Sequence, residues 1–181
     1  MKQAFVFLAE GFEETEAVAT VDVLRRGEIE VLIVSVSGEL LVKGAHGIPV
    51  KADKLFEEVD FNEGNVIVLP GGMPGASNLN AHEGLKKEIL QYYEDNKYLA
   101  AICAAPLVFG GLGLLKGKEA TCYPGFESTL TDAIICDDPI VQDGRIITGK
   151  GPGFAINFGL KLVAVLQGQV KADEVASGLL V

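Results

Sequence analysis

Short apolar runs alternate with amphipathic stretches along most of the chain. Runs rich in aliphatic, aromatic and β-branched residues predict buried strands at residues 3–8, 28–36 and 66–69, and a fourth that ends at Cys103. Apolar residues at helical spacing predict helices at 14–26, 77–96, 106–115, 154–167 and 172–177. Strands and helices that alternate with short links are typical of an α/β fold built on a mostly parallel sheet.

Smaller β elements are predicted around this sheet. Residues 40–43 and 48–51 flank Gly44-Ala45-His46-Gly47 and should form a hairpin, because glycine accommodates the positive φ of a tight turn. Shorter strands are predicted at 119–122, 133–136 and 140–148, the last as a hairpin around Asp143-Gly144. Neither an internal repeat nor a linker interrupts the pattern, so we predict a single domain over residues 1–181.

Composition narrows the class of protein. The chain has 181 residues, 49% of them hydrophobic, which is enough for one large core. Its net charge of −10 is spread along the chain, whereas nucleic-acid binders gather Lys and Arg on one surface, so we expect no nucleic-acid partner.

The pattern also argues against membranes and export. Residues 98–115 contain no charged residue, but Pro106 and three glycines would break a membrane helix, so we predict a buried strand, a turn and a helix, with no membrane contact. The apolar stretch at residues 4–9 is too short for a secretory signal. The chain has an odd number of cysteines, Cys103, Cys122 and Cys136, and their spacing shows no disulfide pattern. This favours reduced thiols, so we expect a cytoplasmic protein.

Cys103 is the candidate nucleophile. It lies where an apolar run turns into a helix, and Pro106 suits the first helical turn because it has no N–H to satisfy. A helix N-terminus favours thiolate over thiol, so we expect a reactive sulfur at this turn. The alternative is an inert cysteine of the core, since free cysteine is among the most buried residue types.

Two other loops should meet Cys103, because the carboxyl ends of parallel strands share one edge of a sheet. Gly71 and Gly72 follow the third strand and could offer backbone N–H groups to an oxyanion, although Pro-Gly-Gly also forms a plain turn. The acidic segment 13–16 opens the first helix. We expect most of it to be solvated and at least one carboxyl to point inward, where burial raises its pKa and lets it hold a proton for the sulfur.

Other candidate side chains carry weaker signals. His46 in the hairpin turn and His82 at a helix start are expected at the surface rather than as bases for the cysteine. Tyr123 follows a predicted strand and is either a pocket wall or an ordinary packing residue. The sequence contains no metal-ligand spacing, phosphate loop or dinucleotide fingerprint, so we expect no metal and no cofactor.

Several motifs taken together resemble the ThiJ/PfpI superfamily, in the branch of the parkinsonism-associated deglycase and the bacterial YajL protein. The matching segments are residues 9–16 (AEGFEETE), 21–26 (VDVLRR), 68–72 (VLPGG), 100–106 (AAICAAP) and 151–153 (GPG). The resemblance implies a flavodoxin-like three-layer sandwich, a class I glutamine amidotransferase-like domain that usually forms a homodimer. Cys103 would be an oxidisable nucleophile, Glu16 the protonated carboxyl that hydrogen-bonds it, and Gly72 and Ala104 the residues whose amides face the pocket.

The resemblance also implies activities. Members are described as deglycases of protein and nucleotide adducts of methylglyoxal or glyoxal, as glutathione-independent glyoxalases, and as redox sensors or chaperones. The expected substrate is therefore a small dicarbonyl or a glycated amine, with oxidation sensing or a binding-only role as alternatives.

Departures from the family pattern refine these expectations. The peptidase branch has a histidine directly after its cysteine, and this chain has Ala104, which disfavours cysteine-protease activity. Tyr123 stands where the deglycase branch often has a histidine, and His46 where it has an arginine from the dimer mate. Arg26 matches an arginine that lines the pocket across the dimer.

Overall fold

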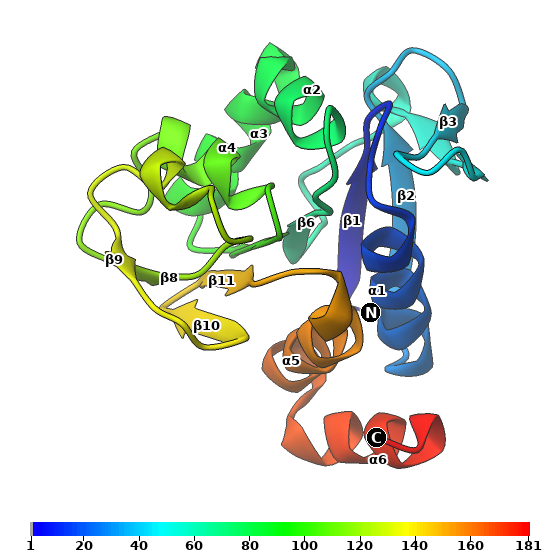
Figure 1. The fold of residues 1–181 in the computed structure, drawn as a ribbon. Helices are drawn as coiled ribbons and strands as arrows, with labels where there is room; N and C mark the ends of the chain where they lie inside the picture. Colours follow the sequence, from blue (N-terminus) through cyan, green and yellow to red (C-terminus); the bar gives the residue numbers. More distant parts are fainter. Residues whose placement is uncertain (1) are drawn as a thin grey trace.

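The apolar runs assemble into one sheet at the centre of the fold. The protein was analysed as a computed structural model that describes residues 2–181 (Figure 1). Over these residues the main sheet has seven strands in the order β10-β11-β7-β6-β1-β2-β5, all paired in parallel except β10 with β11. The strands are β1 Gln3–Leu8, β2 Glu30–Ser35, β5 Lys54–Leu55, β6 Val66–Leu69, β7 Tyr98–Ile102, β10 Ile140–Asp143 and β11 Ile146–Gly149.

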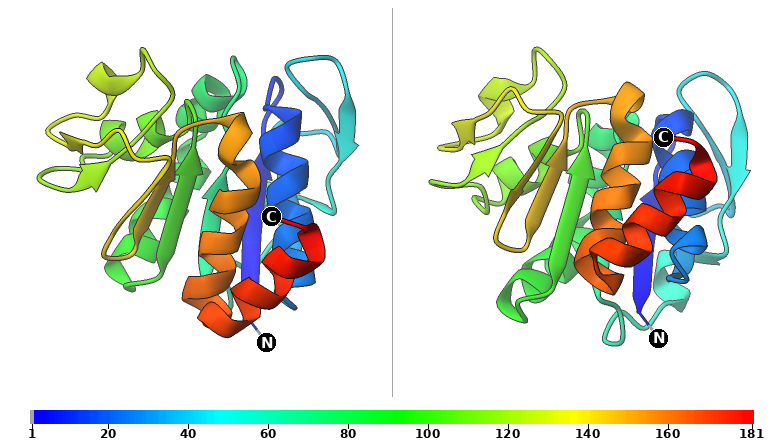
Figure 2. Two further views of the ribbon diagram at one scale, coloured as in Figure 1. Left: turned by 60° about the horizontal axis from the view of Figure 1, so that its bottom comes forward. Right: turned by 90° about the horizontal axis from the view of Figure 1, so that it is seen from below.

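Helices cover both faces of this sheet, as the predicted three-layer sandwich requires. One face holds α1 (Glu14–Arg26) and α5 (Ala155–Gln167), with α6 (Gln169–Leu179) packed on α5 (Figure 2). The other face holds α2 (Gly75–Ala81), α3 (Glu83–Glu94) and α4 (Pro106–Gly111). The flavodoxin-like fold predicted from the sequence is confirmed.

Alternation along β1 shows how the sequence builds two cores. Phe5 and Phe7 pack in the cluster beneath α2, α3 and α4, whereas Ala4 and Val6 pack in the cluster beneath α1 and α5. Successive side chains of a strand point to opposite faces, so a strand that is buried on both sides must be apolar throughout.

The strand order creates a crevice at one edge of the sheet. β1 and β6 are neighbours, and the chain leaves β1 toward α1 on one face but leaves β6 toward α2 on the other. Ligands of open α/β sheets bind at such a switch point, outside the carboxyl ends of the strands. The loops after β1, β6 and β7 all lie at this edge.

The sequence prediction was wrong about the segment 77–96, which is not one helix. α2 ends at Ala81 and α3 begins at Glu83, because His82 has an extended backbone with ψ 100°. Its Nδ1 atom accepts a hydrogen bond from the Leu85 amide at 3.0 Å and so caps the second helix. Apolar spacing continues across this break, so periodicity alone does not reveal it.

The remaining elements are short. The predicted hairpin forms from β3 (Leu41–Lys43) and β4 (Pro49–Lys51), and β10 and β11 form the second one. The strands predicted at 28–36, 119–122 and 133–136 and the helix at 106 are shorter than predicted, whereas α6 extends beyond the predicted 172–177 at both ends. The other elements are β8 Glu119–Ala120 and β9 Ile134–Ile135, and the 3₁₀ turns η1 Phe56–Glu58, η2 Glu127–Thr129 and η3 Pro152–Phe154. Across residues 2–181, every helix is too short or too polar to cross a membrane.

Candidate active site

Cys103 lies on a strained turn directly after β7. Its backbone φ is +64°, in the left-handed region that few non-glycine residues adopt, and its amide donates to the Gly149 carbonyl at 2.8 Å. Such a conformation costs about 1–3 kcal/mol and persists only where the surrounding fold fixes it. The residue is 8% exposed, so the predicted turn is present and the sulfur is mostly covered.

Glu16 is the carboxyl that meets this sulfur. It lies in the first turn of α1 with no exposed surface, and its Oε2 atom accepts a hydrogen bond from the Gly71 amide at 2.7 Å. The carboxyl also neighbours the Cys103 thiol and shifts its pKa, and Oε1 has no hydrogen-bond partner among the residues described. The sequence predicted that at least one carboxyl of residues 13–16 points inward, and the Glu16 carboxyl does so.

The pair titrates as one unit. Burial raises the pKa of Glu16 to about 7, and burial together with the neighbouring carboxylate raises the pKa of Cys103 to about 12. The pair therefore holds one proton over a wide range above about pH 7. Burial and the Glu16 carboxylate thus oppose the thiolate that the helix N-terminus was expected to favour, whereas the nearby amides support it.

Three backbone amides surround the pair. Those of Gly72 and Ala104 act on the Cys103 sulfur and favour its thiolate form, whereas the Gly71 amide donates to Glu16. Gly72 has a φ of +86°, and a Cβ on it would lie 2.4 Å from the Glu13 nitrogen, so the turn requires glycine. The amides of Gly72 and Ala104 are thus placed where negative charge on sulfur or oxygen could be stabilised.

Tyr123 reaches the site through its backbone. Its amide donates to the Cys103 carbonyl at 2.9 Å, and its ring lies beside Gly151 with the side chain 45% exposed. The buried hydroxyl of Thr148 accepts a hydrogen bond from the Thr121 amide at 3.0 Å, and this bond holds the segment before Tyr123 against β11. Sequence analysis missed Thr148, because a single threonine in a strand carries no local signal.

His46 pairs with a buried carboxylate. Its Nδ1 atom lies 2.8 Å from Glu14 Oε2, and the amides of His46 and Ile48 donate to Glu14 Oε1 at 2.7 Å and 3.3 Å. These bonds fasten the 44–48 turn to the start of α1. His46 is exposed as expected, but Glu14 is buried, so fewer of the first-turn carboxylates are solvated than the sequence suggested.

Glu13, Glu14 and His46 also bring their potential metal-ligand atoms within 4.8 Å of one another. Both carboxylates already accept hydrogen bonds. Glu13 accepts one from the Glu16 amide, and Glu14 accepts one from the His46 amide in the 44–48 turn. The N-terminus of a helix disfavours a cation. We therefore interpret the group as a hydrogen-bond network.

Arg26 lies away from the sulfur within its own chain. It ends α1, about 15 Å along the helix from Glu16, and its Nε atom donates to Asp22 at 2.8 Å. Its suggested role across a dimer stays a prediction.

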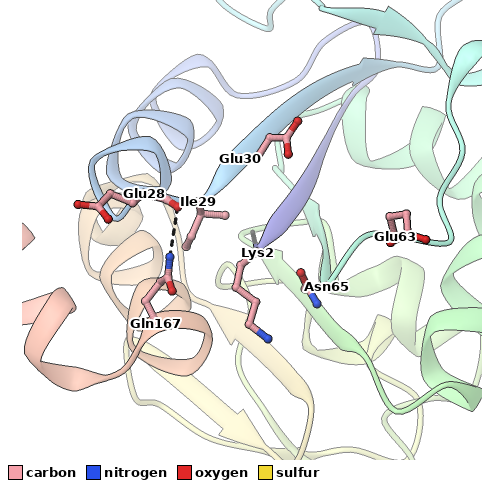
Figure 3. Close-up of a pocket in the computed structure, with 7 residues that line it drawn as sticks. All are labelled: Lys2, Glu28, Ile29, Glu30, Glu63, Asn65 and Gln167. Carbon is pink, nitrogen blue, oxygen red and sulfur yellow. Dashed lines mark hydrogen bonds between the residues drawn. The ribbon is translucent and has the colours of Figure 1, made fainter.

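A wide hollow of about 890 Å³ lies at the opposite edge of the sheet, beside the start of β1 and β2 (Figure 3). Carboxylates of Glu28, Glu30 and Glu63 surround it, and the side-chain amide of Gln167 donates to the Glu28 carbonyl at 3.2 Å. The three loops that carry Cys103, Glu16 and Gly72 all lie at the other edge, so this hollow is separate from the candidate active site.

Comparison with known proteins agrees with this geometry. The family model described as the DJ-1/PfpI family matches residues 2–165. The chain belongs to the DJ-1/PfpI family. It is 42% identical over 182 residues to Protein DJ-1 homolog A of Arabidopsis thaliana, and 33% identical over 181 residues to Glutathione-independent glyoxalase DJR-1.2 of Caenorhabditis elegans. The family predicted from the motifs is therefore confirmed.

These DJ-1/PfpI relatives differ in length. The alignment covers 99% of this chain but 46% of the Arabidopsis protein, so the chain spans about half of that relative, whereas it covers 98% of this chain and 96% of the nematode protein. The solved structure of oxidized Toxoplasma gondii DJ-1 superposes with a TM-score of 0.96 at 36% identity, over 99% of this chain and 98% of the other. The DJ-1 fold thus extends over the whole described chain.

Proposed function

We propose that this protein is a cysteine-dependent enzyme that acts on methylglyoxal or glyoxal, either free or as adducts on amines. The observation that supports this most is the meeting of three groups at one sheet edge: the Cys103 sulfur, the buried Glu16 carboxyl and the amides of Gly72 and Ala104. A nucleophile, a proton donor and oxyanion donors are what addition to a carbonyl requires. The nematode relative named as a glutathione-independent glyoxalase points to the same substrate class.

The site holds one proton that Glu16 and Cys103 share, and the reactive form is the one in which the proton lies on Glu16 and Cys103 is a thiolate. The thiolate attacks the aldehyde carbon, a C–S bond forms, and the aldehyde oxygen takes the proton of Glu16 to give a hemithioacetal. The Glu16 carboxylate then removes the hydrogen of that carbon as a proton and returns it to the neighbouring carbon, which yields a thioester. Water hydrolyses the thioester to the hydroxy acid and restores the thiol. On a glycated amine in its hemiaminal form, the thiolate would displace the amine: the C–S bond forms as the C–N bond breaks, the nitrogen takes the proton of Glu16, and the same hemithioacetal results.

A direct experiment follows lactate formation from methylglyoxal without glutathione. We expect Cys103→Ser and Glu16→Ala each to lose at least about 100-fold in turnover, because the nucleophile or the proton donor is gone. Cys136→Ser removes a thiol from the β8–β9 region and serves as the matched control with unchanged turnover. Wild-type turnover in either site variant would reject the mechanism, and the same proteins tested on a glycated peptide or nucleotide distinguish free dicarbonyl from adduct.

The second candidate is a redox sensor or redox-regulated chaperone that uses the same sulfur. Structural support comes from the amides of Gly72 and Ala104, which could hold the oxygens of an oxidised Cys103. An oxidized structure exists for the similar Toxoplasma protein. Each of two peroxide molecules would transfer one oxygen to sulfur and leave as water, giving a sulfinic acid.

We further propose that the protein acts as a cytoplasmic homodimer. A groove of about 270 Å³ on the α1 side is lined mainly by apolar residues, among them Ala17, Val18, Ile33 and Val50. Val18 is 52% exposed at this groove, and Ile48 of the neighbouring hairpin turn is 59% exposed. A second copy that covered this face would also approach His46 and the turn beside the active site.

A further inference from the structure

Glu13 does not contact the sulfur, yet it belongs to a closed ring of hydrogen bonds around the proton donor. The Glu13 amide donates to the Gly71 carbonyl at 2.9 Å, and the Gly71 amide donates to Glu16 Oε2 at 2.7 Å. The Glu16 amide in turn donates to Glu13 Oε2 at 2.6 Å. Glu13 and Glu16 at the start of α1 and Gly71 in the loop after β6 therefore hold one another in place through backbone and side-chain hydrogen bonds.

This ring is a capping box with the backbone of one residue inserted. In an ordinary box the side chain at the third helical position bonds back to the N-cap amide. Here Glu13 is the N-cap and Glu16 stands at that third position, but Gly71 lies between them, and its carbonyl and its amide make one bond each. The helix start thus aims Glu16 at Cys103 and not at its own backbone.

The residue type at the N-cap is unusual for capping alone. Serine, threonine, aspartate and asparagine are the preferred N-caps, and glutamate is not among them. Glu13 is half-buried, and its carboxylate is a charged neighbour of Glu16. A negative charge at this distance opposes a second negative charge on Glu16.

We propose that Glu13 is a positioning residue that favours the form of the site in which the shared proton lies on Glu16 and Cys103 is a thiolate. The inference rests on the proposed function in one respect, that Cys103 is the nucleophile. The other charged groups around this ring are Glu14 and His46, which pair with each other, and Cys103 itself. Removal of the Glu13 charge would let the proton move from Glu16 to the sulfur.

The test measures the rate of Cys103 alkylation by iodoacetamide against pH, with peptide mass spectrometry to assign the modified cysteine. Glu13→Ser keeps a good N-cap without charge, and Glu13→Gln keeps the chain length without charge. In both we expect the midpoint of the profile to move down by about half a pH unit or more, and the alkaline plateau to fall about threefold. Glu13→Asp keeps both cap and charge and should restore the wild-type profile.

Glu10→Gln is the control, because it removes a carboxylate from the same loop without touching the ring. Wild-type midpoints and plateaus in Glu13→Ser and Glu13→Gln would overturn the proposal, as would an equal change in Glu13→Asp, which would indicate a steric role. Alkylation requires no turnover, so it is independent of the lactate assay. If no lactate forms but the alkylation profile shifts as expected, the proposed enzymatic activity is rejected while the proposed role of Glu13 is supported.

Discussion

Gly71 lies so close to Cys103 that a Cβ on the glycine would sit 2.7 Å from the Cys103 Cβ atom. The same added atom would lie 2.9 Å from both the Ala104 nitrogen and Glu16 Oε2. The positions of Cys103, Glu16 and the Ala104 amide therefore all depend on one residue that has no side chain.

Gly71→Ala should disturb the site more than the fold. Because the new methyl group displaces Cys103 or Glu16, we expect at least about a tenfold loss of turnover and a loss of about 1–3 kcal/mol in the free energy of unfolding. Turnover and urea denaturation measure the two effects. Gly153→Ala is the matched control, since its added Cβ would meet no atom within 4 Å. Equal effects in both variants would show that close approach at Gly71 does not matter.

The Glu14–His46 pair should stabilise the fold over a defined pH window. Burial alone would raise the pKa of Glu14, but hydrogen bonds from His46 and from the amides of His46 and Ile48 lower it overall, while the bond to Glu14 raises the pKa of His46. Stabilisation by Glu14 is present above its ordinary pKa of 4.5 and is lost as the pH falls through the lowered value. Stabilisation by His46 is present below its ordinary pKa of 6.5 and is lost as the pH rises through the raised value.

A double-mutant cycle of Glu14→Gln and His46→Ala measures this coupling by urea denaturation. We expect the coupling energy to be largest between about pH 4.5 and 6.5 and to decline on both sides. A coupling energy that does not vary from acid to alkaline pH would mean that the turn is held by the backbone amides alone.

Oxidation should begin at Cys103. Graded hydrogen peroxide, followed by peptide mass spectrometry, should add two oxygen atoms to Cys103 before Cys122 or Cys136 is modified, because two backbone amides favour negative charge at Cys103, against one at Cys136 and none at Cys122. Replacement of Glu16 by alanine should slow this step, since the thiolate loses its proton-holding partner. Earlier oxidation of Cys122 or Cys136 would exclude the sensor candidate.

The apolar groove offers a test of self-association. Val18→Lys places a charge in the middle of the groove, so we expect sedimentation at micromolar concentration to show a monomer where the wild type shows a dimer. Val170→Lys is the control, because Val170 is 74% exposed on α6, away from the groove. A dimer that persists in Val18→Lys would place the interface elsewhere.

Sequence alone predicted every strand of the main sheet except β5, both hairpins and the turn at Cys103, because apolar runs, glycines and Pro106 leave local signals. It also predicted an inward carboxyl in the acidic segment, but only the family resemblance indicated that it was Glu16. The break at His82 and the burial of Glu14 were missed, because each depends on a partner that folding brings close. Glu13 is the intermediate case, since its spacing of three residues from Glu16 is that of a capping box.

The two cores on either side of the sheet also decide what oxidation can produce. Cys122 packs in the cluster beneath α2, α3 and α4, whereas Cys103 packs in the cluster beneath α1 and α5, although the Tyr123 amide binds the Cys103 carbonyl. The two chain segments touch while their sulfurs belong to opposite layers. Cys122 is therefore not positioned to act as a resolving thiol, and the product at Cys103 should be an oxyacid of that sulfur and not a disulfide with Cys122.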